Sequence, residues 1–268
     1  MAIAEDYNFE SLNIISGNLE VRLAENSLEI DAAQALRYKV FFEEMQAKPS
    51  IKQKKSKRDI DEFDHYFDHI LVIDNSKSGK IYDKVLGTYR LNGGNHKDKK
   101  SFFYTSGEYN LSKLLNFDGN ILELGRSCVD QKYRNGKTMQ LLWAFIAQYV
   151  IKYNIKIMFG CASFPGIEIN NHKPALAYLY KKYLAPAHIR PVAIKDRYIA
   201  MKDDFLINKS NFKKFLSSIP PLIKGYIRLG AFVGDGAVID YDFNTIDVCI
   251  VLPTEKVAAR YMDHFDRK

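Results

Sequence analysis

The sequence predicts a mixed α/β protein built around one domain. Segments with strand-like alternation and segments with helical spacing follow one another along the whole chain. Between residues 120 and 152 a strand-like run, a basic turn and an almost wholly apolar helix succeed each other, and a second strand-like run follows at 156–162. With 268 residues, 47% of them hydrophobic, the chain can bury a full core.

The N-terminal half is predicted to combine strands with one long helix. Residues 28–45 carry apolar side chains at helical spacing and stop short of Pro49, so they predict that helix. The charged stretch 48–64 is typical of a loop with one short helix. The other expected elements are a strand at 19–23, strands at 65–74 and 84–91 joined by a polar turn at 75–80, a polar loop at 92–100 and a short helix at 108–115.

The C-terminal half is predicted to continue with alternating helices and strands. After the strand at 156–162 we expect a helix at 174–183, a strand at 192–201, a helix from 211, an apolar segment at 223–229 after two prolines, a glycine turn at 234–236, a strand at 246–252 and an amphipathic helix at 255–265. We divide the chain into an N-terminal tail, 1–18, and a single domain, 19–268, whose part 210–268 is a helical C-terminal extension.

The charge balance favours acidic partners. The formal net charge is +7 and the sequence pI is about 9.0, which suits nucleic acid, anionic lipid headgroups or an acidic protein. The run from Lys48 to Arg58 is basic, but acidic residues follow at once and no nucleic-acid-binding motif accompanies it. A solvated loop is therefore expected there, and no nucleic acid partner.

Location and metal content follow from what the sequence does not contain. There is no signal-peptide pattern, and the longest apolar run, 141–151, is too short to span a bilayer, so we expect a cytoplasmic protein. The three cysteines, Cys128, Cys161 and Cys249, stand in apolar contexts at no metal-like spacing. Buried free thiols are expected, and no metal site.

The most informative segment is the one from 120 to 152. Glu123 and Arg126 lie inside an otherwise apolar strand, where charge is costly unless it is paired or used. The turn that follows carries Lys132, Arg134 and Lys137 at the start of a helix. Backbone N–H groups and the helix dipole point the same way there, so the turn is a candidate anion site.

Five more residues stand out because they are embedded in similar apolar frames. A half-buried arginine usually pairs with a neighbouring carboxylate, and two aspartates three residues apart can simply cap a helix. Together with Glu123 and Arg126 the set is far more specific than any member alone. The five are Arg37, Phe41, Asp61, Asp64 and Arg90.

This set resembles the signature shared by acyl-homoserine-lactone synthases and ornithine-lipid N-acyltransferases, two acyl-carrier-protein-dependent branches of the GNAT acyltransferase fold. The segments LELGRSCV, FGCASFPG, PPLIKGYIRLGA and FNTIDVCIVLP are closer to the ornithine-lipid branch, and the resemblance runs from about Leu19 to Phe265. It implies a central, mostly antiparallel mixed sheet flanked by helices. It also implies transfer of a 3-hydroxyacyl group to the α-amino group of L-ornithine, which forms lyso-ornithine lipid.

Two alternatives stay open at this point. One is an acyl-homoserine-lactone synthase with S-adenosylmethionine as acceptor, against which the extended segment 211–265 argues. The other is a carrier-protein or membrane-surface binding module without catalysis. The segment 220–229 and the tail helix carry apolar and basic residues that suit peripheral contact with the inner face of a membrane, although core packing explains most of them equally.

The basic turn indicates which donor is used. A typical GNAT pyrophosphate loop reads Arg/Gln-x-x-Gly-x-Gly/Ala, but from Arg134 this chain places Lys137 and Met139 at the glycine positions. A close backbone approach to a pyrophosphate needs glycine. The expected donor is therefore a 4'-phosphopantetheine-linked acyl carrier protein rather than acyl-CoA, with no bound cofactor. Lys132, Arg134 and Lys137 would dock it, or be ordinary surface residues.

The resemblance and the residue chemistry together suggest roles. Glu123 and Arg126 are the predicted catalytic pair, with Glu123 accepting the proton of the ornithine ammonium; a structural ion pair of Glu123 with Arg126 or Arg37 is the alternative. Backbone N–H groups at 128–130 would polarise the thioester carbonyl. The remaining assignments concern substrates: Arg37, Phe41, Asp61, Asp64 and Arg90 would bind ornithine, with the aspartates on its cationic end and Arg90 or Arg126 on its carboxylate, and Cys128, Val129 and Asp130 would line the donor site.

Overall fold

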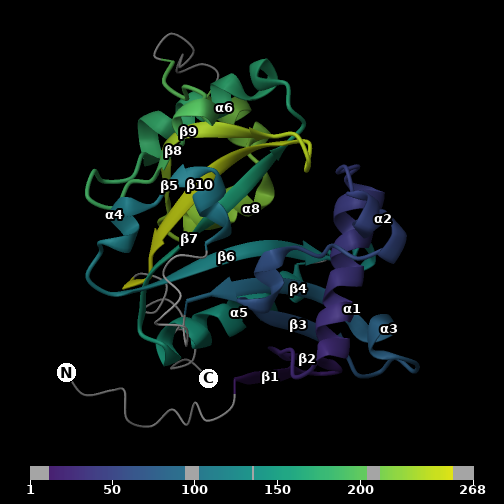
Figure 1. Cartoon of the computed structure of the whole chain (residues 1–268). Helices are drawn as coiled ribbons and strands as arrows, with labels where there is room; N and C mark the ends of the chain where they lie inside the picture. The colour runs from purple at the N-terminus through teal and green to yellow at the C-terminus, as the bar shows by residue number, and fades with distance from the viewer. Residues whose placement is uncertain (1–11, 94–102, 135, 204–211, 256–268) are drawn as a thin grey trace, which may run out of the picture.

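A ten-stranded mixed sheet with helices on both faces forms the protein (Figure 1). The computed structural model describes residues 12–93, 103–134, 136–203 and 212–255. The strand order is β1-β2-β3-β4-β6-β7-β10-β9-β8-β5, in which the β6–β7 and β8–β9 pairs are parallel and the other pairs antiparallel. The predicted mixed α/β class is confirmed.

The bounds of the elements are as follows. The strands are β1 (Asn13–Ser16), β2 (Leu19–Leu23), β3 (Asp68–Asp74), β4 (Val85–Asn92), β5 (Tyr109–Asn110), β6 (Asn120–Val129), β7 (Ile155–Pro165), β8 (Val192–Ala193), β9 (Phe232–Asp240) and β10 (Thr245–Pro253). The helices are α1 (Ser27–Tyr38), η1 (Lys39–Glu44), α2 (Ile51–Ser56), η2 (Glu62–His65), α3 (Ile81–Lys84), η3 (Tyr104–Gly107), α4 (Ser112–Leu115), η4 (Gln131–Tyr133), α5 (Lys137–Lys152), α6 (Ile169–Tyr183), η5 (Lys195–Arg197), α7 (Phe212–Ser218) and α8 (Pro221–Arg228).

Alternation along the strands separates two hydrophobic layers. In β3, Leu71 and Ile73 pack with the apolar face of α1, whereas Ile70 and Val72 join the larger core under α5. The same larger core continues under α6 and α8 in the C-terminal half of the sheet. The opposite face of that half is covered by the segment 103–115, where the Phe103 and Phe159 rings meet edge to face at 5.2 Å. Helix α1 and the segment 103–115 therefore share one side of the sheet.

The two halves of the sheet separate between β6 and β7. Their parallel ladder begins at Asn120 opposite Ile155 and ends at Glu123 opposite Phe159. Beyond this point β6 continues to pair with β4, while β7 continues to pair with β10. Figure 1 shows the two strands diverging toward the side that carries α1 and α2. The predicted segment with the two charged residues thus lies where the sheet opens.

The predicted glycine turn at 234–236 is wrong, because these residues lie inside β9. Gly236 has φ +87°, and a Cβ atom on it would lie 2.5 Å from the Tyr198 ring. A Cβ atom on Gly234 would lie 3.0 Å from the carbonyl oxygen of Pro191. The glycines therefore let neighbouring segments approach β9 closely rather than reverse the chain.

Several boundaries also differ from the predictions. Residues 13–16, assigned to the tail, form β1 at the edge of the sheet. Helix α6 begins at Ile169, five residues before Pro174. Of the strand expected at 192–201 only β8 forms, followed by η5 and an isolated bridge from Ile199 to Ala237. The C-terminal part contains β9 and β10 as well as helices, and the helix predicted at 255–265 lies almost wholly outside the described residues.

None of the helices in the described ranges is both long enough and apolar enough to cross a membrane. The longest of them, α5, has 16 residues.

Candidate active site

A set of arginines and aspartates lies buried on the α1 side of the sheet, beside the opening. Arg37, in the last turn of α1, is fully buried. Its Nε lies 2.9 Å from Asp59 Oδ2, and its Nη2 lies 2.8 Å from Asp64 Oδ1. Gln34, one turn earlier on the same helix, donates to the other Asp64 oxygen at 2.9 Å. Helix α1 therefore anchors the loop that follows α2.

Two strand arginines complete the set. Arg90 Nη1 lies 2.6 Å from Asp61 Oδ1 and 2.8 Å from Asp64 Oδ1. Arg126 Nε lies 3.2 Å from Asp59 Oδ2, and its Nη2 lies 3.2 Å from Asp61 Oδ2. Every aspartate thus contacts two arginines, and every arginine contacts two aspartates. We call this closed arrangement the Arg–Asp ring: Arg37, Asp59, Arg126, Asp61, Arg90 and Asp64.

The ring is electrically balanced within itself. Burial raises the pKa of Asp64, but the guanidinium groups of Arg37 and Arg90 outweigh it and hold that pKa below its usual value of 3.8. The pKa of Asp61 is likewise lowered, by Arg90 and Arg126 against the effect of burial. Burial, with Arg37 nearby, lowers the pKa of His69 to about 4, so this imidazole stays neutral. Asp61 and Asp64 are therefore ionised, and their charges are already matched by the arginines.

Asp61 also caps a helix, as the simpler interpretation of the pair predicted. Its Oδ1 accepts a hydrogen bond from the Phe63 amide at 3.0 Å at the start of η2. The proposed grip of Asp61 and Asp64 on the ornithine ammonium stays a prediction. The ring gives both carboxylates cationic partners, which leaves little unbalanced negative charge for a substrate.

A β-bulge places Glu123 and Arg126 on the same side of the sheet. Residues three apart in a regular strand point to opposite faces. In β6, Gly125 pairs with Arg90 and Cys128 with Thr88, so Arg126 and Ser127 together face a single residue of β4. Arg126 has φ +50° at this bulge, a strained conformation for a residue with a side chain. Its two aspartate partners hold it there.

The guanidinium of Arg126 is also enclosed by two aromatic rings. Its Cζ lies 4.6 Å from the centre of the Tyr104 ring and 4.3 Å from that of Phe243. Phe243 belongs to the turn between β9 and β10 and meets the Phe41 ring edge to face at 5.7 Å. Phe243, from the C-terminal half of the sheet, thus links Phe41 to Arg126.

Glu123 is buried and bound by backbone amides. Its two carboxylate oxygens accept hydrogen bonds from the amides of Tyr104, at 3.1 Å, and Thr105, at 2.6 Å. Burial raises its pKa to about 6, although these hydrogen bonds and the Arg90 charge act in the opposite direction. Within the described ranges neither Arg126 nor Arg37 forms an ion pair with Glu123. The alternative of a structural ion pair is therefore not what the structure shows.

The residues predicted for the donor site end β6 and begin α5. Cys128 and Val129 are buried in the β4–β6 ladder, and burial raises the pKa of the Cys128 thiol. The Asp130 amide donates to the Leu86 carbonyl at 2.8 Å, so this N–H is already used. The Asp130 side chain pairs with Lys39 at 2.7 Å.

The three basic residues of the turn are exposed but not equivalent. Arg134 is bound at both ends of its guanidinium, by the Val129 carbonyl at 2.9 Å and by Glu44 at 2.5 Å. Lys132 and Lys137 extend from η4 and from the first position of α5. Arg134 therefore holds the turn in place, and a docking role for the three basic residues stays a prediction.

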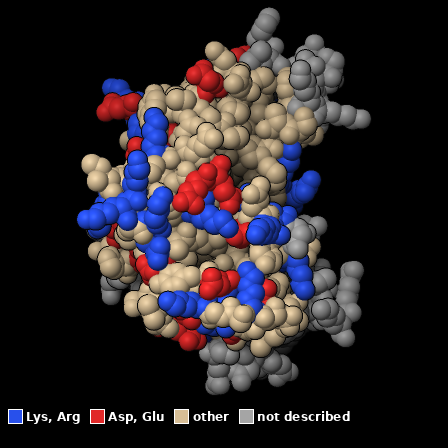
Figure 2. Space-filling view, turned by 90° about the vertical axis from the view of Figure 1, so that its right-hand side faces the viewer, with Lys and Arg blue, Asp and Glu red and all other residues tan. Residues whose placement is uncertain are grey.

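The basic run around α2 lies on a solvent-exposed face. Lys52, Lys54 and Lys55 are exposed there. Figure 2 shows Lys and Arg side chains gathered on the side that carries α1, α2 and α3, with Asp and Glu among them. The arrangement fits the solvated segment expected from the sequence.

Asp59 is the site residue that sequence reasoning missed. It is fully buried and bridges Arg37 and Arg126. In the sequence it opens an acidic run in a charged loop, which looks exposed. No pattern in the sequence pointed to Asp59, because the predicted set already held three carboxylates, Asp61, Asp64 and Glu123, for its three arginines.

The comparisons with known proteins agree with this architecture. A family described as an acetyltransferase (GNAT) domain matches residues 36–144, from α1 into α5. An L-ornithine N(alpha)-acyltransferase of Agrobacterium fabrum (strain C58) is 43% identical over 93% of this chain and 85% of its own length. Its counterpart in Rhizobium meliloti (strain 1021) is 44% identical over 92% and 84% of the two chains. That of Rhodobacter capsulatus is 37% identical over 93% and 95%.

Fold and site define an acyltransferase of the GNAT class. At this identity over nearly the whole chain, the protein belongs to the L-ornithine N(alpha)-acyltransferase family. Among solved structures, an N-acyl amino acid synthase from uncultured soil microbes aligns with a TM-score of 0.48 at 10% identity, over 91% of this chain and 92% of that one. A non-catalytic binding module is excluded as an interpretation.

Proposed function

We propose that the protein transfers a 3-hydroxyacyl group from acyl carrier protein to the α-amino group of L-ornithine, forming lyso-ornithine lipid. The observation that carries the proposal is the gathering of Glu123, Arg90 and Arg126 on one face of the sheet, where β6 and β7 separate. The names of the relatives supply the acceptor. An acyl-homoserine-lactone synthase is the second candidate in the assay below.

Arg90 is the better candidate for the ornithine carboxylate. Its Nη1 is engaged in the Arg–Asp ring, but its Nε and Nη2 are buried and have no hydrogen-bond partner among the residues that the structure describes. Buried donors without partners are costly, and a carboxylate that accepted from both would remove the cost. The guanidinium of Arg126, by contrast, contacts two aspartates of the Arg–Asp ring through Nε and Nη2. It is also enclosed by the aromatic rings of Tyr104 and Phe243.

Glu123 is the candidate base for the attacking amine. The α-ammonium must lose one proton before its nitrogen attacks the thioester carbonyl and a second one when the C–S bond breaks. The leaving thiolate then takes up a proton, so that one proton is released per amide formed. A carboxylate whose pKa is raised to about 6 by burial is suited to accept a proton near neutral pH, directly or through water. The β-bulge at Arg126 and Ser127 lies beside Glu123. The backbone at this bulge does not follow the regular β4–β6 ladder.

The donor is assigned to a carrier protein because of the turn before α5. Lys137 and Met139 occupy the positions where glycines would let a pyrophosphate approach the backbone. Lys132 offers an exposed charge to an acidic protein. We further propose that the enzyme works in the cytoplasm, and that the segment 220–229 brings it into peripheral contact with the inner membrane.

One assay tests these assignments. The full-length protein is incubated with 3-hydroxyacyl carrier protein, or with the matching CoA thioester, and a panel of amino acids or S-adenosylmethionine, and the products are identified by mass spectrometry. We expect the lyso-lipid with ornithine, formed preferentially from the carrier-protein donor. Lactone formation from S-adenosylmethionine would overturn the acceptor, and preference for CoA would overturn the donor.

The E123Q variant tests the base. Glutamine keeps the size of the side chain and one oxygen for the two amides but cannot accept a proton. Loss of a general base typically costs about 100-fold or more in kcat. Turnover close to that of the wild type would eliminate Glu123 from this role.

A further inference from the structure

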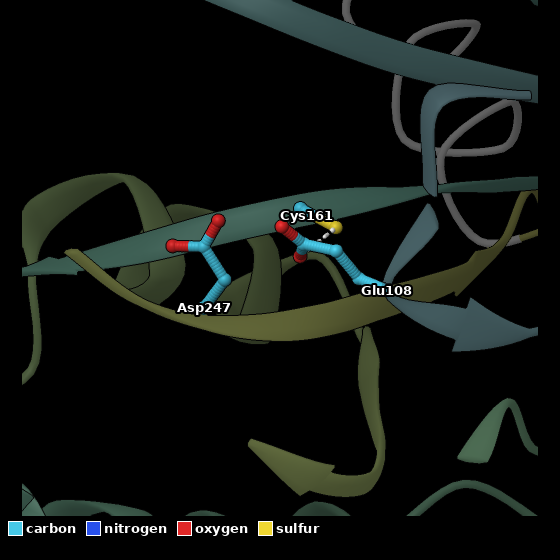
Figure 3. Close-up of side chains that lie close together, drawn as sticks. All are labelled: Glu108, Cys161 and Asp247. Atoms are coloured by element: carbon cyan, nitrogen blue, oxygen red, sulfur yellow. Dashed lines mark hydrogen bonds between the residues drawn. The ribbon is translucent and has the colours of Figure 1, made fainter. Parts of the chain in front are cut away.

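A second group of buried ionisable side chains lies on the same side of the sheet, beyond β7. Asp247 pairs with Ser163 and Cys249 with Cys161 in the β7–β10 ladder. Cys161 and Asp247 are therefore diagonal neighbours on one face. Glu108 reaches them from the residue before β5, and one sulfur or oxygen atom from each side chain lies within 4.8 Å of the other two (Figure 3).

Within the described part of the chain, the polar atoms of this group are not all paired. The Cys161 thiol donates to Glu108 Oε2 at 3.1 Å, and Arg197 Nη2 lies 3.6 Å from Glu108 Oε1. Asp247 is 4% exposed, yet its Oδ1 has no hydrogen-bond partner among the described residues. A buried carboxylate oxygen without a donor is costly and rare. It leaves room for a donor supplied by a ligand.

The charge around this group differs from that in the Arg–Asp ring. In the ring three guanidinium groups balance three carboxylates. Here burial and the nearby Asp247 raise the pKa of Glu108 to about 7, and burial raises the pKa of Asp247 to about 6, although the nearby Ser163 and Thr245 hydroxyls act to lower it. The Arg126 charge also acts to lower the pKa of Asp247, but less than burial raises it. A cation bound between Glu108 and Asp247 would supply the charge that the fold leaves out.

A surface hollow adjoins the group. It has a volume of about 570 Å³ and is lined in part by Asp196, Asp240 and Asp242, together with Arg197. Arg197 is the link, because it both lines the hollow and contacts Glu108. The three carboxylates outnumber the one guanidinium, so the electrostatic potential in the hollow favours a small cation.

We propose that Glu108 and Asp247 bind the side-chain ammonium of the acceptor amino acid and so select a diamino acid over neutral amino acids. The inference rests on the proposed function and reassigns the cationic end of the acceptor from Asp61 and Asp64. An ammonium carries three N–H donors, which match the unpartnered Asp247 oxygen and the Glu108 carboxylate. A metal ion fits less well, because the Cys161 thiol donates its proton to Glu108, whereas a metal requires the thiolate.

The test compares ornithine with norvaline, which has the same carbon chain but no side-chain ammonium. Acylation of both is measured by mass spectrometry for the full-length wild type and the D247N, E108Q and D118N variants. Asp118 is exposed in the turn before β6 and serves as the control. We expect D247N and E108Q to raise the KM for ornithine about thirtyfold or more, the effect of removing one partner of a buried charge pair. The KM for norvaline should change little, and D118N should change neither.

The outcomes separate the inference from the proposed function. If the wild type acylates no amino acid, the proposed function fails. If it acylates ornithine but D247N changes both substrates in the same proportion, or neither, the cation site is wrong. Stoichiometric zinc in the purified protein together with chelator-sensitive activity would also overturn it. Thermal melting checks folding of each variant, and the E108Q result decides the matter if D247N does not fold.

Discussion

Asp59 shows how much of this site depends on a single side chain. It is fully buried and connects Arg37 on α1 with Arg126 on β6. Removing one partner of a buried ion pair leaves an uncompensated charge, which costs far more than the pair itself contributes. Asp59 therefore determines whether two buried guanidinium groups are tolerated.

We predict that D59N destabilises the protein by about 3–5 kcal/mol. The matched control is D31N, because Asp31 also binds an arginine through both oxygens, Arg58, but its side chain is 35% exposed. That variant should lose about 1 kcal/mol or less. Urea unfolding of the three proteins measures the difference. Equal losses of unfolding free energy in D59N and D31N would show that burial of the Arg–Asp ring does not determine how much Asp59 contributes to stability.

Glu123 couples stability to pH in the opposite sense to Asp61 and Asp64, whose pKa values are lowered. Its pKa is about 6 in the folded protein against an ordinary value of 4.5. Between these values the folded state binds the proton more tightly than the unfolded state, so this carboxyl stabilises the fold at low pH and loses that contribution as pH rises. Full loss above about pH 6 corresponds to about 2 kcal/mol.

We therefore predict that the stability of E123Q relative to the wild type increases by about 2 kcal/mol between pH 4 and pH 7. Measuring both proteins by denaturant unfolding across this range cancels groups that titrate in both, such as His69. The side-chain amide of E123Q also changes the hydrogen bonds from the Tyr104 and Thr105 backbone, and this change does not depend on pH. The difference in unfolding free energy between the two proteins at pH 4 measures it. A difference that does not vary with pH would contradict the raised pKa.

At the scale of the element, β6 and β9 both depart from regular strands where function or packing requires it. The bulge at Arg126 allows Glu123 and Arg126 to share a face although they are three residues apart. In β9, Gly236 adopts φ +87° under the Tyr198 ring. Neither irregularity shortens the strand, because the ladder resumes on both sides.

Two glycine substitutions should act with opposite signs. In G236A, the added methyl group meets the Tyr198 ring and the φ angle is unfavourable, so we expect a loss of more than about 1 kcal/mol. In G225A, on α8, nothing lies within 4 Å of the added Cβ, and the higher helix propensity of alanine should stabilise by about 0.5–1 kcal/mol. Thermal melting of the two variants distinguishes them. If G236A were neutral, the close approach of Tyr198 would not be a constraint.

At the scale of the whole molecule, the two halves of the sheet meet around one opening. The Arg–Asp ring belongs to the N-terminal half, and the Glu108 and Asp247 group belongs to the C-terminal half. The turn between β9 and β10 bridges them, since Phe243 contacts both Arg126 and Phe41. The acceptor would thus be held from both halves of the sheet, by Arg90 in one half and by Glu108 and Asp247 in the other.

Docking of the carrier protein can be tested with Lys132, which lies outside this opening in the turn before α5. We predict that K132E raises the KM for the 3-hydroxyacyl carrier protein about three- to tenfold, which corresponds to about 1 kcal/mol at a docking surface. The KM for ornithine should not change. K182E, an exposed lysine at the end of α6, is the control. Added salt should reduce the difference between K132E and the wild type, and an equal effect of both variants would place docking elsewhere.

Local patterns in the sequence determined most of the element types. Alternation or apolar runs located β2, β3, β4, β6, β7 and β10, and helical spacing located α1 and α5, because these periodicities arise from the geometry of a single segment. The resemblance brought Arg37, Asp61, Asp64, Arg90, Glu123 and Arg126 together as a set. The structure places them on one side of the sheet.

Long-range contacts decided the rest. In the sequence the glycines of β9 are typical of a turn. In the structure Tyr198 and the segment 191–193 pack against them. Asp59 looks exposed until α1 and β6 are brought to either side of it. Glu108, Cys161 and Asp247 are separated by more than 50 residues at each step, so only the sheet register makes them neighbours. Which carboxylates are matched by arginines, and which are left for a substrate, depends on that packing because the energy of a buried charge depends on its partners in space.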